Sequence, residues 1–257
     1  MFRLLMILAL GAALVSRPAL AADTDIKRLT AFFEDVAFGA EYTAKGSSVV
    51  QKWESPLRIN VSAMEGKLID KAGGGKELKL QNATPAAANI DIIRKHLKTL
   101  IQVTGIKAES PKDVGKAPNF FIKFVPRLAM HAPFLVKGAS PDLLKRLAAP
   151  GVCYFLTAAK EGRIVWATIV VNNALEPAAM TACLLEEMTQ ALGLPNDSDL
   201  VQPSVFNNRS QPVQLGRSDL IVIRTLYDAK LKAGMGKLEA MAIAGSVIAE
   251  LDRKLTK

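Results

Sequence analysis

The N-terminal segment of this chain indicates which residues form the mature protein and in which compartment that protein folds. Residues 4–16 form an apolar run after a positively charged start, and residues 19–21 read Ala-Leu-Ala, a small-x-small cleavage site. This order predicts a secretory signal peptide over residues 1–21, because the run is too short to span a membrane as a helix. An uncleaved membrane anchor is the alternative, but Arg17 and Pro18 interrupt the run. We therefore expect an exported protein.

Export makes a disulfide the expected state of the two cysteines, Cys153 and Cys183. Two cysteines usually pair in an oxidising compartment. On a helical wheel Cys183 falls on the face opposite the apolar residues, beside Glu187, so core packing alone does not account for it. Closing a loop of this size would contribute about 3–4 kcal/mol. Two separate free thiols are the alternative.

Composition excludes several classes of protein. Half of the 257 residues are apolar and the net charge is +9, so a disordered polycation is excluded. Basic and aromatic residues are not interleaved, so we expect no nucleic acid partner. Lysines recur over residues 107–123 and 230–257, which favours contact with an anionic cell-wall polymer or lipid surface. Ordinary solvated helix faces are the alternative explanation.

Hydrophobic periodicity predicts a single α+β domain over residues 22–257. The expected strands cover residues 53–61, 120–125, 153–159 and 164–172, the last two forming a hairpin. The expected helices cover residues 85–103, 141–148, 177–192, 218–230 and 235–255. Residues 71–76 and 194–217 are expected to be loops. His96 lies among basic residues in its helix and is expected at the surface.

The helix over residues 180–193 carries the most informative pattern. Glu186 and Gln190 are four residues apart and stack on one face, while Glu187 lies about 100° around the helix. A zinc-peptidase helix has two histidines at this spacing, with a general-base glutamate directly after the first. In the extended form a glycine and a third ligand follow, and here Gly193 and Asn196 occupy those positions.

The segment resembles the zincin fold of metallopeptidases, with the three histidine positions replaced by Glu186, Gln190 and Asn196. More closely, the chain resembles an exported bacterial family known as a domain of unknown function. The resemblance is strong over residues 150–236 and reaches weakly back to Trp53. The residues after the helix that carry it, which are also candidate cleft or loop residues, are Asp197, Ser204, Phe206, Asn207 and Asp219.

The resemblance implies a zincin-like core with a small mixed sheet, an active-site-type helix and C-terminal helices. It also implies a periplasmic or secreted location in a bacterium. It does not imply a proven reaction.

Ligand chemistry leaves the cofactor open. Gln and Asn offer weak carbonyl oxygens and Glu offers a hard carboxylate, so Glu186, Gln190 and Asn196 would hold zinc poorly. An oxygen-preferring divalent metal such as Ca²⁺ or Mg²⁺ would suit them better. The absence of any metal is an equal alternative. In that case these side chains form a solvated helix face and hydrogen bonds that fix the loop over residues 194–208.

Two functions therefore follow as hypotheses. The first is a metallopeptidase-like module that no longer catalyses a reaction and binds an envelope protein, a peptide or a glycan. The second is an active metal-dependent hydrolase in which Glu187 is the general base and Glu186, Gln190 and Asn196 hold the metal. The ligand chemistry favours the first.

Overall fold

The computed structural model describes residues 20–39 and 46–255. Most of the predicted signal peptide lies outside the described residues. Within them, no helix combines the length and the apolar character needed to cross a membrane.

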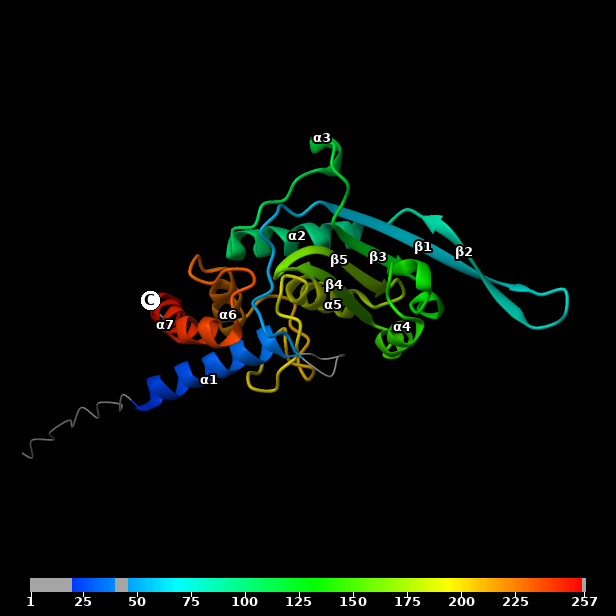
Figure 1. Cartoon of the computed structure of the whole chain (residues 1–257). Helices are drawn as coiled ribbons and strands as arrows, with labels where there is room; N and C mark the ends of the chain where they lie inside the picture. The colour runs from blue at the N-terminus through cyan, green and yellow to red at the C-terminus, as the bar shows by residue number, and fades with distance from the viewer. Residues whose placement is uncertain (1–19, 40–45, 256–257) are drawn as a thin grey trace, which may run out of the picture.

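A five-stranded mixed sheet forms the centre of the fold (Figure 1). The strands are β1 (Ile59–Asp70), β2 (Lys76–Ala83), β3 (Phe120–Val125), β4 (Cys153–Lys160) and β5 (Arg163–Asn172). Their order across the sheet is β2-β1-β3-β5-β4. The three central strands run parallel, and the two edge strands pair antiparallel with their neighbours. The predicted α+β class is therefore confirmed.

Helices cover the sheet and form a separate layer beside it (Figure 1). They are α1 (Leu20–Phe38), α2 (Ala87–Thr104), α3 (Pro111–Val114), α4 (Pro141–Ala148), α5 (Pro177–Gln190), α6 (Arg217–Tyr227) and α7 (Lys237–Leu255). Side chains of α2 and α5 share a core with one face of the sheet, and α4 shares a second core with the other face. Helices α1, α6 and α7 enclose a third core.

Helix α5 lies between two of these cores. Its residues Leu184 and Met188 pack toward the sheet, whereas Leu185 packs toward α1 and α6. Cys183 is 3% exposed and belongs to the sheet-side core, so the prediction that it faces away from the apolar residues was wrong. A helix enclosed on both sides has no solvated face of the kind that a one-sided amphipathic pattern predicts.

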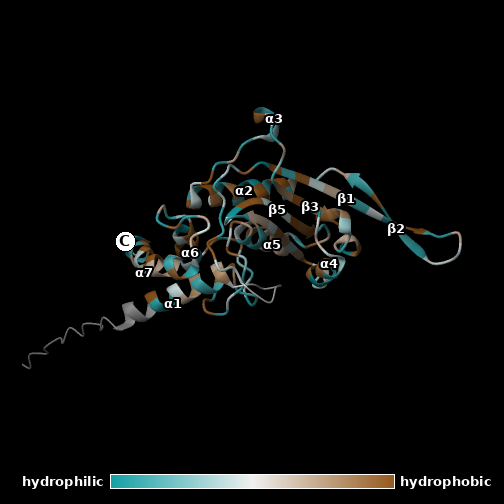
Figure 2. Cartoon of the chain, viewed as in Figure 1, coloured by the Kyte–Doolittle hydropathy of each residue, from teal (hydrophilic) through white to brown (hydrophobic). Residues whose placement is uncertain are grey.

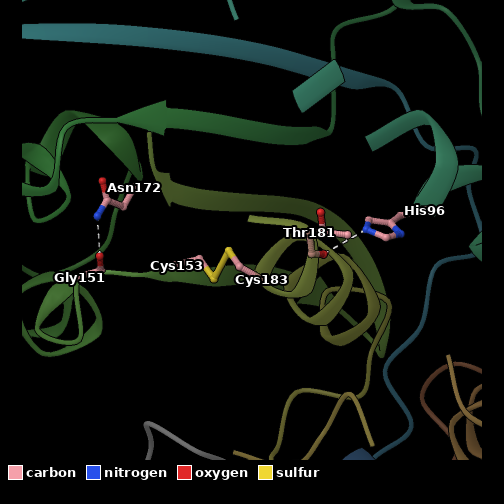
Figure 3. The surroundings of a disulfide bond; sticks show 6 residues. All are labelled: His96, Gly151, Cys153, Asn172, Thr181 and Cys183. Atoms are coloured by element: carbon pink, nitrogen blue, oxygen red, sulfur yellow. Dashed lines mark hydrogen bonds between the residues drawn. A yellow bond between two sulfur atoms is a disulfide. The ribbon is translucent and has the colours of Figure 1, made fainter. Parts of the chain in front are cut away.

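The predicted disulfide joins Cys153 at the start of β4 to Cys183 in α5 (Figure 3). One hydrogen bond lies on each side of the disulfide. Nδ2 of Asn172 donates to the carbonyl of Gly151 at 2.8 Å, and Nε2 of His96 contacts the carbonyl of Thr181 at 3.1 Å. The disulfide thus fixes α5 to the edge strand, and His96 fixes it to α2.

Most predicted elements occur within a few residues of their expected bounds, but the first hairpin differs. The strand expected over residues 53–61 begins at Ile59 and continues to Asp70, and β2 was not predicted. Together they form an arm that projects beyond the other strands (Figure 1). Its outer part lacks the nearly continuous apolar sequence of β3 and β5 (Figure 2). Residues 65–77 are all exposed, so no core requires apolar side chains there.

Candidate functional site

The end of the motif helix is bonded to the loop that follows it. Nε2 of Gln190 donates to Oδ1 of Asp197 at 2.7 Å. Nδ2 of Asn196 lies 2.7 Å from the backbone carbonyl of Asp197 and 3.2 Å from that of Asp35 in α1. The structure therefore brings together Gln190, Asn196 and Asp197, and it adds Asp35, which the motif did not indicate.

Burial sets the protonation behaviour of Asp197. Loss of water around this carboxyl raises its pKa, and nearby Asp199 raises it further. Hydrogen bonds from the side chains of Asn208 and Gln190 partly offset this effect, because they stabilise the charged form. A carboxylate so placed is a strong acceptor for the Gln190 amide.

The two motif glutamates differ in exposure. Glu187 is 6% exposed, whereas Glu186 is half-buried, and both make interactions within the protein. Gln190 is 2% exposed, so the alternative of a solvated face does not hold for Glu187 and Gln190. Among the residues that the structure describes, no three His, Cys, Asp or Glu side chains are grouped so that they could hold a metal ion.

A second buried carboxyl organises the rest of the loop. Ser204 donates its hydroxyl to Oδ1 of Asp219 at 2.6 Å, and the backbone N–H of Gly216 donates to Oδ2 at 2.8 Å. Burial raises the pKa of Asp219, while these two bonds and one from the N–H of Val205 lower it. Asp219 therefore closes the loop at the first turn of α6.

The other two predicted loop residues have equally definite structural roles. Phe206 is fully buried and packs edge to face on Phe32 of α1, with ring centroids 5.8 Å apart. Asn207 donates from Nδ2 to the carbonyl of Ser198 and to Oδ1 of Asp199, each at 3.2 Å. These contacts hold the loop against the helical layer.

Two aromatic side chains satisfy the last carbonyls of the α5 segment. Nε1 of Trp53 donates to the carbonyl of Ala191 at 2.9 Å, and the hydroxyl of Tyr227 donates to that of Leu192 at 2.7 Å. Gly193 follows with a φ of +114°, and a side chain there would clash with the carbonyl of Gln51. The glycine is required because the chain turns and approaches another backbone at the same point.

A basic groove of about 530 Å³ opens beside these aromatic residues. Its lining includes Trp53, Tyr227 and three lysines, Lys52, Lys107 and Lys232, with Glu54 as the acidic residue. Lys107 and Lys232 are exposed. The groove therefore joins the two lysine-rich parts of the sequence.

Lys52 is the buried member of this group. Its ammonium donates to the backbone carbonyls of Leu226 and Leu231, and it lies 5.5 Å from the ring centroid of Tyr227. Burial lowers its pKa, Glu54 raises it, and Lys232 lowers it further. Sequence reasoning missed this residue, since one lysine before a tryptophan carries no local signal.

Comparison with known proteins identifies the family. A family model described as "Protein of unknown function (DUF2927)" matches residues 27–245. The chain belongs to the DUF2927 family. No curated protein and no solved structure matches it.

The DUF2927 match covers every contact described above. It begins within α1 and ends within α7, so the motif helix, its loop and the basic groove all lie inside the family domain. This agrees with the predicted membership of a family of unknown function. The disulfide of this DUF2927 domain also agrees with the sequence prediction, and it is compatible with export.

Proposed function

We propose that this protein is an exported, non-catalytic binding module of the bacterial cell envelope with a metallopeptidase-like core. The observation that carries this proposal is that the side chains at two of the three zinc-ligand positions serve the structure. Gln190 and Asn196 direct their amides at Asp197 and Asp35. These bonds attach the loop to α5 and α1.

The chemistry of these residues supports loss of the metal. Zinc sites use thiolate, imidazole and carboxylate ligands, whereas a neutral amide oxygen is a weak ligand. Both amides use their nitrogens in these bonds, so a metal could reach them only through their weakly ligating oxygens. Turning the Gln190 amide toward an ion would break its bond to the buried Asp197 carboxyl, which opposes metal binding at that position.

The basic groove is the surface we assign to binding. It lies at the end of the motif helix, where Trp53 and Tyr227 donate to the carbonyls of the two residues after α5. Its lysines favour an anionic partner, for which a negatively charged envelope glycan is the best match. Tyr227, which is half-buried in the lining, offers part of an aromatic ring on which a sugar can pack.

Metal content tests the core of the proposal. We expect purified residues 22–257 to hold no stoichiometric metal by elemental mass spectrometry, and we expect a chelator to leave the melting temperature unchanged. A stoichiometric ion that disappears in Glu186→Ala would overturn the proposal. Lys145→Ala, an exposed change in α4, is the control for nonspecific effects of substitution.

A metal-dependent hydrolase is the second candidate function. The observation in its favour is the buried carboxyl of Glu187 at the general-base position of the motif. If the protein hydrolyses peptides or glycans, Glu187→Gln should abolish that activity while the melting temperature stays near that of the wild type. Equal activity in the wild type and in Glu187→Gln would exclude this candidate.

A further inference from the structure

The arm formed by β1 and β2 presents an open sheet edge at the far end of the molecule from the α7 terminus (Figure 1). β2 is an outer strand of the sheet and pairs with β1 on one side. Leu68 is 50% exposed and Ile69 is 37% exposed. Two-stranded ribbons without a core are marginally stable in water, and open edges pair readily with further strands.

The two faces of the arm differ in chemistry. On one face Leu68 lies opposite Leu78, and on the other face Lys67 lies directly opposite Lys79. Like charges directly opposite each other destabilise a strand pair. An acidic group placed beside Lys79 on its open side would remove this penalty.

We propose that the arm pairs with the arm of a second copy of this chain, β2 against β2 antiparallel, with Leu78 on the two-fold axis. In this register Glu77 of each copy lies opposite Lys79 of the other. Each Lys67–Lys79 pair then gains an acidic neighbour on the same face. On the opposite face a row of four leucines forms, from Leu68 and Leu78 of each copy.

The neighbouring registers lack this complementarity. Residues that lie opposite each other must be on the same face of the sheet. A symmetric pairing can therefore change register only by moving the two-fold axis from one residue of β2 to another. An axis at Glu77 places two glutamates opposite each other, and an axis at Lys79 places two lysines opposite each other. An axis at Leu80 pairs Lys79 with Gln81 and leaves the lysine pair uncompensated.

The position of Leu78 also fits the shape of the molecule. It lies two residues after β2 begins, near the turn of the hairpin. Antiparallel pairing there places the two molecules at opposite ends of the joined arms. The contact involves a few residues of each copy, so we infer a weak, concentration-dependent dimer. This inference is independent of the proposed function, because the arm contains neither the motif nor the groove.

Charge reversal tests the pairing with the full mature chain. In analytical ultracentrifugation over micromolar to millimolar concentrations, Glu77→Lys and Lys79→Glu should each weaken self-association by about tenfold or more. An equimolar mixture of the two variants should recover association, because every lysine then meets a glutamate. A wild-type protein that stays monomeric throughout, or variants that associate like the wild type, would overturn the proposal.

Crosslinking tests the register itself. The native cysteines are bonded to each other, so an introduced thiol reacts without a competing free one. Leu78→Cys should form a covalent dimer under mild oxidation, since the two positions meet on the axis. Gln81→Cys, three residues along the same strand, should remain monomeric. Equal crosslinking of both variants would contradict the register.

Discussion

His96 shows how burial decides the behaviour of a single residue. Its basic neighbours in the sequence predicted a surface position, but it is 3% exposed and lies between α2 and α5 (Figure 3). The carbonyl of Thr181 can only accept, so Nε2 of His96 carries the proton in this bond. Burial lowers the pKa of the imidazole, the Thr181 bond raises it, and Lys95 lowers it.

The lowered pKa predicts loss of stability in acid. The unfolded chain takes up a proton near pH 6.5, before the folded protein does, so the free energy of unfolding should fall as the pH drops below about 6.5. His96→Gln keeps a hydrogen-bond donor without this titration. Urea unfolding at pH 7.5 and pH 5.5, conditions on the two sides of about 6.5, should give a smaller difference for His96→Gln than for the wild type. An equal difference would assign the acid sensitivity to other groups.

Helix α5 illustrates how one element is held by contacts from distant parts of the chain. The disulfide fixes its middle, the Gln190 amide fixes its last turn to the loop, and Trp53 caps the carbonyl beyond it. Each contact acts on a different part of the helix. Their effects on stability are therefore expected to be separable.

Removing the disulfide should lower stability markedly. Cys153→Ala/Cys183→Ala should reduce the free energy of unfolding by about 3–4 kcal/mol, because the unfolded chain regains the freedom of a closed loop. Urea unfolding of the variant and of the reduced wild type should give similar values. A loss below about 1 kcal/mol would mean that core packing alone holds α5 on β4.

The Gln190–Asp197 bond offers a matched pair of variants. Gln190→Glu places a second carboxyl beside Asp197 in a buried position, and it should cost about 2 kcal/mol or more. Adding Asp197→Asn restores an amide–carboxylate bond with the roles exchanged, and it should recover at least half of the loss. Urea unfolding measures both. If Asp197→Asn gives no recovery in the Gln190→Glu background, the bond does not position the loop.

The basic groove is a property of the whole molecule. Its walls come from residues 52–56, 104–107 and 227–232, which are distant in sequence. Folding brings Lys107 and Lys232 to one opening. Their combined field, rather than the net charge of the chain, is expected to select an anionic partner.

Charge reversal in the groove tests this selection. Lys107→Glu/Lys232→Glu should weaken binding to heparin, used as a polyanionic glycan probe, by about tenfold. Raising the salt concentration should also weaken binding of the wild type, because salt screens the attraction between the lysines and heparin. Lys145→Glu/Arg146→Glu reverses two exposed charges in α4, so it changes the net charge by the same amount, and this matched control should bind like the wild type. Equal losses in both variants would indicate attraction by net charge alone.

Local pattern in the sequence determined most of the regular elements. Periodicity predicted α2 and α4, short apolar runs predicted β3 and the β4–β5 hairpin, and expected export predicted the disulfide. A repeating apolar face in a helix and a short apolar run between loops are both readable without the fold. One of the alternatives left open for the motif was a set of hydrogen bonds to the loop over residues 194–208, and Gln190 forms such a bond.

Only the tertiary structure determined which residues are buried by contacts from a second side. It placed α5 between two cores, enclosed His96, brought Asp35 to Asn196, and assembled the groove around Lys52. It also extended β1 and β2 into an exposed arm. These features depend on contacts between residues far apart in the chain, and a local pattern holds no record of such contacts because each residue is read against its neighbours only.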